Sequence, residues 1–285
     1  MRERGLGRMN KDNLDDIRLL AETLPAVSQQ MRSSLNNFYA AFERIATPER
    51  RAEDPELDRQ SALLQQSYYR MLRLANNLTH ASRLVEEVSL SLYTLDLAAV
   101  VKEIYQECLP HAETMGLQLH FRCEGAPLIA DANRNGIRCV LYHFLSNAFK
   151  FTKAGKNITI YCRKEGNNLL LSVEDEGCGI NELSPDLLFE RYLQNDPYSP
   201  PPHGLGLGLP VARQTARAMG GQILLNSREC GACATLILPA HKGSAILQEP
   251  RSLYIDSFPH ALVGLSDALP LKAFLQNPMH ETDMR

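Results

Sequence analysis

Three short stretches in the second half of the 285-residue chain carry the side chains that could do chemistry. In HFLSNAFKFT, His143, Asn147 and Lys150 stand at positions i, i+4 and i+7, so they project from one face of a predicted helix. A neutral oxygen ligand beside an ammonium group suits a magnesium phosphate. Taken alone, the same pattern also fits a solvated helix face.

The other two stretches are rich in glycine. DEGCGI, residues 175–180, follows a predicted strand, and the Asp175 carboxylate could accept a hydrogen bond from an exocyclic amine such as that of adenine. Gly177 and Gly179 would let the backbone approach a flat ligand, although an ordinary glycine turn is the alternative. GLGLGL, residues 204–209, opens a predicted helix, where backbone amides and the helix dipole favour an anion.

The first third of the chain is predicted to form two long helices. Apolar residues recur at steps of three and four from Leu20 to Ile45 and again from Leu64 to Leu92, which is typical of coiled-coil helices. TPERRAEDPELDR breaks the pattern between them, so we expect an antiparallel hairpin. Each stripe needs a further partner, which favours a homodimer with a four-helix bundle. The alternative is that the hairpin packs on the C-terminal part of its own chain.

After Leu92 the pattern changes to alternating strands and helices. The order predicts a mostly antiparallel sheet in an α/β sandwich, so the fold class is α+β. We therefore predict a helical-hairpin dimerisation domain over residues 14–92 and a second domain over 93–240. The tail, residues 241–285, has short apolar pieces without a repeat, and no role is predicted for it.

Composition excludes several classes of protein. A net charge of -3 provides no basic field for nucleic acid, and no run of apolar residues is long enough for membrane insertion. The start, MRERGLGRMNKDNLDD, is charged and unlike a secretory signal, so we expect a cytoplasmic protein. The seven cysteines are scattered, and Cys230 and Cys233 lack a second pair for a zinc site, so both are expected to have a structural role.

In this order and context, the three stretches closely resemble the ATP-binding domain (HATPase, or GHKL, type) shared by sensor histidine kinases and related ATPases. DANRNGIRCVLYHFLSNAFKFT and FERYLQ also resemble kinase motifs, and the resemblance covers residues 14–240. It implies ATP and Mg²⁺ as ligands. By position it implies that Asn147 binds the metal, Lys150 contacts phosphate, Asp175 recognises adenine, Gly177 and Gly179 shape the adenine pocket, and Gly204, Gly206 and Gly208 anchor a lid that includes NDPYSPPPH.

Two further positions complete the implied site. Thr235 corresponds to the threonine of a final glycine-threonine motif that is otherwise incomplete here. His143 stands where hydrolytic relatives carry a glutamate that activates water. Because His is a poorer replacement for that base, rapid ATP hydrolysis is not expected. A packing role for His143 is the alternative.

The first helix resembles the acceptor helix of the kinase family, which has the form Ser-His-Glu-x-Arg-Thr-Pro-Leu-Asn. In SQQMRSSLNN the fitting residues are Ser28, Arg32, Leu35 and Asn36, while Gln29, Gln30, Ser33 and Ser34 replace the histidine, glutamate, threonine and proline. A carboxamide nitrogen is delocalised and cannot attack phosphorus as imidazole can, and Gln30 removes the general base. Ser28, Ser33, Ser34 and His80 are alternative acceptors, but none has an adjacent carboxylate.

These patterns predict an ATP-binding, histidine-kinase-like signalling protein. Its degenerate acceptor indicates action through conformation or through docking to a response regulator or another kinase. One alternative is an active kinase that phosphorylates a partner, so the sequence leaves enzymatic activity open. Another is a stand-alone GHKL ATPase or an anti-sigma-type serine kinase, which the paired helical stripes disfavour.

Overall fold

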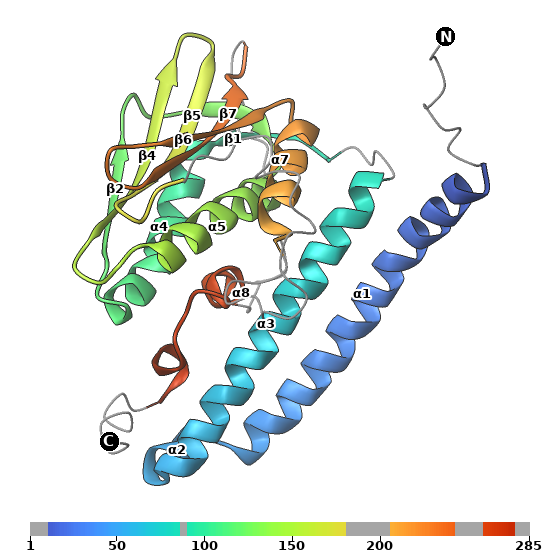
Figure 1. Cartoon of the computed structure of the whole chain (residues 1–285), viewed down its shortest axis with the longest axis vertical. Helices are drawn as coiled ribbons and strands as arrows, with labels where there is room; N and C mark the ends of the chain where they lie inside the picture. The colour runs from blue at the N-terminus through green and yellow to red at the C-terminus, as the bar shows by residue number, and fades with distance from the viewer. Residues whose placement is uncertain (1–10, 86–89, 181–205, 243–258, 277–285) are drawn as a thin grey trace, which may run out of the picture.

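The computed structural model describes residues 11–85, 90–180, 206–242 and 259–276. The chain folds into a helical hairpin, an α/β sandwich and a short C-terminal segment that lies beside both (Figure 1). Within the described residues, every helix is either too short or too polar to cross a bilayer.

The hairpin consists of α1 (Lys11–Ile45) and α3 (Pro55–Val85), which run side by side along most of their length (Figure 1). Between them lies a short helix that the sequence patterns did not predict, α2 (Pro48–Glu53). Thr47 caps this helix by accepting from the Arg50 amide, and Pro48 begins it with a fixed φ angle. The Thr47 cap and Pro48 therefore start a short helix in the segment where the apolar repeat is interrupted.

The predicted α+β class and the mostly antiparallel sheet are confirmed. Five strands form a sheet in the order β2-β4-β5-β7-β6, in which only β2 and β4 are parallel. These strands are β2 (Gln118–Cys123), β4 (Asn157–Glu165), β5 (Asn168–Asp175), β6 (Gln222–Ser227) and β7 (Ala232–Pro239). A separate antiparallel pair consists of β1 (Tyr93–Asp96) and β3 (Ile129–Ala132).

Three helices cover one face of the five-stranded sheet (Figure 1): α4 (Leu97–Thr114), α5 (Arg134–Phe151) and α7 (Gly208–Ala218). Alternate residues of β5, namely Leu169, Leu171 and Val173, are buried, as expected for a strand with one face on a core. Asn133 caps α5 by accepting from the Gly136 amide. The core between sheet and helices therefore fixes the direction of α5, which carries the predicted metal and phosphate ligands.

The C-terminal segment, residues 259–276, packs against both α3 and α5. It contains α8 (His260–Leu265) and the 3₁₀ helix η1 (Leu271–Phe274). The Arg51 guanidinium donates to the Phe274 carbonyl at 2.7 Å, and the Gln66 amide donates to the Leu269 carbonyl at 2.9 Å. Although no role was predicted for the tail, this part of it joins the hairpin to the sandwich.

Candidate functional site

Asp175 is the last residue of β5, the central strand of the sheet, and the turn after it lies against the end of α5. Its Oδ1 accepts hydrogen bonds from the Gly177 amide at 2.9 Å and the Ala232 amide at 3.2 Å. Both bonds fall on one oxygen, so they orient the carboxylate and leave Oδ2 for a ligand. Burial raises the pKa of this carboxyl group, against the opposing effects of those two amides and Arg228. A Cβ on Gly177 would lie 2.7 Å from the Phe151 carbonyl oxygen, so the turn requires glycine.

The glycine-rich start of α7 lies directly against α5. A Cβ on Gly208 would lie only 2.9 Å from His143 Nδ1. Gly206 adopts a φ of 70°, a conformation that glycine enters at little cost. The N-terminal amides of α7 therefore lie beside the helix face that carries His143 and Asn147, where the dipole favours an anion. Gly204, FERYLQ and NDPYSPPPH lie outside the described residues.

Lys150 and His143 occupy a cluster of buried charges. The Lys150 ammonium lies 3.7 Å from an Asp267 oxygen, and Arg73 Nη1 lies 3.4 Å from the same oxygen. Arg73 also donates to Ser146 Oγ at 2.9 Å, and its other nitrogen lies 3.5 Å from His143 Nδ1. The C-terminal segment thus places the Asp267 carboxylate beside Lys150, the residue predicted to contact phosphate.

The pKa values of two of these groups reflect burial and neighbouring cations. The pKa of His143 lies well below its ordinary value, first because of burial and then because of the positive charges of Arg73, His80 and Lys150. Burial also lowers the pKa of Lys150 to about 8, and the attraction of Asp267 only partly offsets this effect. His143 is therefore a neutral imidazole near pH 7.

Thr235 is not close to Asp175 in the fold. It pairs in register with Ser172, and their hydroxyl oxygens lie 2.9 Å apart. Side chains alternate along a strand, so Ser172 and Asp175 point to opposite faces of the sheet, and Thr235 shares the face of Ser172. The residue that approaches Asp175 is instead Gly231, whose added Cβ would lie 1.8 Å from the Asp175 carbonyl oxygen. In the sequence, the signal for this close approach was the position of Gly231 in a turn just before a predicted strand.

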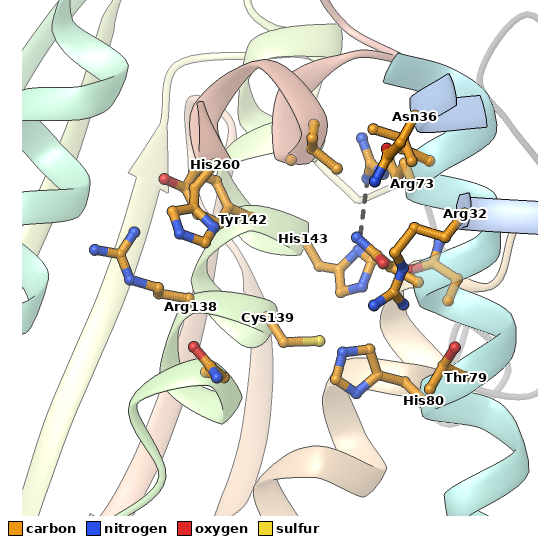
Figure 2. Close-up of a pocket in the computed structure, with 16 residues that line it drawn as sticks. Arg32, Asn36, Arg73, Thr79, His80, Arg138, Cys139, Tyr142, His143 and His260 are labelled. Carbon is orange, nitrogen blue, oxygen red and sulfur yellow. Dashed lines mark hydrogen bonds between the residues drawn. The ribbon is translucent and has the colours of Figure 1, made fainter. Parts of the chain in front are cut away.

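Figure 1 shows α1 on the side of the hairpin that faces away from the α/β sandwich. Gln29 and Gln30 are both exposed there. Ser28 is fully buried, so as an acceptor it would be out of reach of a nucleotide. Arg32, one helical turn beyond Gln29, lines a cavity that extends to His143 on α5 (Figure 2).

Residues 132–242 match the family model of the histidine kinase-, DNA gyrase B- and HSP90-like ATPases. This range contains the predicted nucleotide residues on α5, β5, α7 and β7. Residues 132–242 therefore belong to a domain of this ATPase type, called the ATPase domain below, and the helical hairpin precedes it.

Two curated relatives support this assignment. The sensor histidine kinase AruS of Pseudomonas aeruginosa is 30% identical over 215 residues, which are 72% of this chain and 21% of the relative. The sensor protein TorS of Escherichia coli is 38% identical over 119 residues, which are 41% of this chain and 12% of the relative. The chain thus spans about a fifth or less of the length of these two relatives.

Two solved structures show the same fold. Full-length ShkA in complex with AMPPNP aligns with a TM-score of 0.58 at 24% identity, over 79% of this chain and 47% of that chain. The Acinetobacter baumannii histidine kinase AdeS aligns with a TM-score of 0.50 at 20% identity, over 70% of this chain and 98% of that chain.

Proposed function

We propose that this chain is an ATP-binding signalling protein of the sensor histidine kinase type whose own acceptor site is degenerate. It acts through its conformation or by docking to a partner protein, such as a response regulator or another kinase. The observation that carries the proposal is one juxtaposition. The turn after Asp175 lies against the end of α5 and the start of α7 lies against His143 of the same helix, while the hairpin presents an exposed amide pair, Gln29 and Gln30, in place of a nucleophile and its base.

In the proposed nucleotide site, different residues bind the adenine, the phosphates and the metal ion. The Asp175 carboxylate accepts from the adenine amine, and the glycine turn beside it leaves room for the ring. Lys150 and the amides at the start of α7 neutralise phosphate charge. The described residues contain no group of three or more His, Cys, Asp or Glu that could hold a metal. Asn147 would therefore share Mg²⁺ with phosphate oxygens and water, a common arrangement for this ion.

The hairpin favours pairing with a second copy. Val27, Phe38 and Ile45 on α1 are 51%, 53% and 63% exposed, although all three belong to the predicted apolar stripe. The C-terminal segment and α7 cover α3 instead, so the alternative of packing within the chain accounts for α3 but leaves these three residues uncovered. A homodimer through α1 would bury them.

Calorimetric titration of ATP with Mg²⁺ tests the nucleotide site. We expect Asp175→Asn to weaken binding by about tenfold or more, because an amide in place of the carboxylate loses a charge-assisted hydrogen bond. Asn147→Ala is expected to remove the dependence on Mg²⁺. Glu165→Gln, at the opposite end of the β4–β5 hairpin, is the matched control and should bind normally. Unchanged binding in both site variants would overturn the assignment.

Incubation with γ-labelled ATP tests the degenerate acceptor. The protein alone is expected to acquire no acid-labile phosphate, because neither glutamine provides a nucleophile or a base. The same incubation with candidate response regulators distinguishes docking from phosphorylation of a partner. Labelled protein would support an active kinase, and rapid phosphate release without labelling would support a stand-alone ATPase.

A further inference from the structure

A cavity of about 390 Å³ lies between the hairpin and the ATPase domain (Figure 2). Its walls come from α1, α3, α5 and α8. The charged or titratable nitrogen groups in the wall are Arg32, Arg73, Arg138, His80, His143 and His260. Four asparagines add further amide donors, and none of the sixteen lining residues is an aspartate or a glutamate. Such a lining presents donors and positive charge to any ligand.

The three arginines differ in how their charge is balanced. Arg138 donates to both carboxylate oxygens of Glu107 at 2.9 Å, outside the lining of the cavity. Arg73 is buried and forms an ion pair with Asp267 at 3.4 Å, a carboxylate that it shares with Lys150. Arg32 Nε is shielded from solvent and has no hydrogen-bond acceptor within the described part of the chain. A buried donor without an acceptor is costly, and an anion in the cavity would remove that cost.

Figure 2 shows Arg32 and His80 of the hairpin on one side of the cavity and Cys139 and His143 of α5 on the other. Burial lowers the pKa of His143 most, and the further lowering by Arg73, His80 and Lys150 agrees with a positive potential here. An anion in the cavity would reduce the electrostatic repulsion between the positive groups of the hairpin and those of the ATPase domain.

We propose that the cavity is a binding site for the phosphate group of a small molecule, which would join the hairpin to the ATPase domain when bound. Guanidinium and imidazole groups match the several acceptor oxygens of a phosphate, and the volume admits more than one such group. Of the predicted nucleotide residues, only His143 lines this cavity.

The test is a calorimetric titration of inorganic pyrophosphate into the full chain, without nucleotide or Mg²⁺. We expect saturable binding that Arg32→Gln weakens by about tenfold or more, the range for loss of a hydrogen bond to a charged group. Arg32→Lys, which keeps the charge, should bind better than Arg32→Gln. Arg44→Gln, an exposed position on the same helix outside the cavity, is the matched control and should bind normally.

Two further arms make the result decisive. Asn77→Asp adds a carboxylate to the wall and should abolish binding, while thermal melting shows that each variant folds. A repeat with saturating ADP identifies the source of the phosphate. Binding that persists indicates a separate phosphate compound, and binding that ADP blocks but that still needs Arg32 indicates a nucleotide phosphate. Absence of pyrophosphate binding, or equal binding by Arg32→Gln and Arg44→Gln, would overturn the proposal, even if ATP binds to the ATPase domain.

Discussion

Lys150 has two competing negative partners, the Asp267 carboxylate beside it and the nucleotide phosphate proposed to bind there. The lysine side chain is almost fully buried and lies 3.7 Å from the Asp267 oxygen. Because its pKa is lowered to about 8, loss of its proton falls within an accessible pH range. We therefore expect the protonation of Lys150 to affect both the binding of nucleotide and the contact with the C-terminal segment.

We predict that affinity for ATP falls as the pH rises from about 7 to 9, because Lys150 then loses the charge that attracts phosphate. Stability should change in the opposite direction. The folded chain binds fewer protons than the unfolded chain between about pH 8 and the ordinary lysine pKa of about 10.4, so the lysine contribution to the free energy of unfolding rises with pH there. Calorimetry at several pH values measures the first effect and chemical denaturation the second. Lys150→Met should remove both, and an unchanged pH profile in that variant would contradict the assignment.

Gln29→His alone is predicted not to restore strong self-phosphorylation. The imidazole would still lack a neighbouring carboxylate to take its proton, and Ser34 leaves the helix without the bend that proline favours. The triple change Gln29→His, Gln30→Glu and Ser34→Pro should acquire more acid-labile label from γ-labelled ATP. Equal labelling of the single and triple variants would show that base and helix geometry do not limit the reaction.

At the scale of elements, the C-terminal segment acts as a connector rather than as a loose tail. η1 reaches the start of the hairpin's second helix, where the Gln276 amide donates to Asp58 at 3.0 Å. α8 reaches α5, where a Cβ on Gly264 would lie 2.5 Å from the Tyr142 ring. Between them, the buried Arg73 depends on Asp267 for its ion pair.

A chain ending at residue 258 is predicted to lose much of the docking between hairpin and ATPase domain. Removing Asp267 leaves Arg73 as a buried charge without its carboxylate, which typically costs about 3–5 kcal/mol. Hydrogen exchange in the middle of α3 should become faster, while exchange in β4 and β5 stays slow. A chain ending at residue 276 keeps the segment and should match the full chain. Equal protection of α3 in both truncations would show that the segment contributes nothing to docking.

At the scale of the whole molecule, the two sides of the hairpin have different surroundings. α3 packs against α1, α7, α8 and η1, whereas α1 contacts mainly α3. The outer apolar residues of α1 therefore remain exposed, and they are the part of the predicted stripe that a second copy would cover.

We predict a homodimer by light scattering at micromolar concentration, and a shift to monomer in the double variant Phe38→Glu and Ile45→Glu. Charges on this face would oppose its burial against another apolar helix. Leu224→Glu, at a 45% exposed position on β6, is the control and should leave the mass unchanged. A monomeric mass for the unaltered protein would count against the dimer and against the paired-stripe argument.

The amino-acid sequence by itself indicated the long helices and the strands, the α+β class and the candidate residues for a nucleotide, because helical and strand periodicities and glycine turns are local properties. Local patterns did not show that Thr235 lies on the sheet face opposite Asp175, since strand register depends on partners distant in sequence. They also gave no sign of the role of residues 259–276. The contact between Arg51 and Phe274 joins residues 223 positions apart, and the lining of the cationic cavity comes from four helices. Only tertiary packing brings these groups together, because each contact forms only when separate elements bury shared surface.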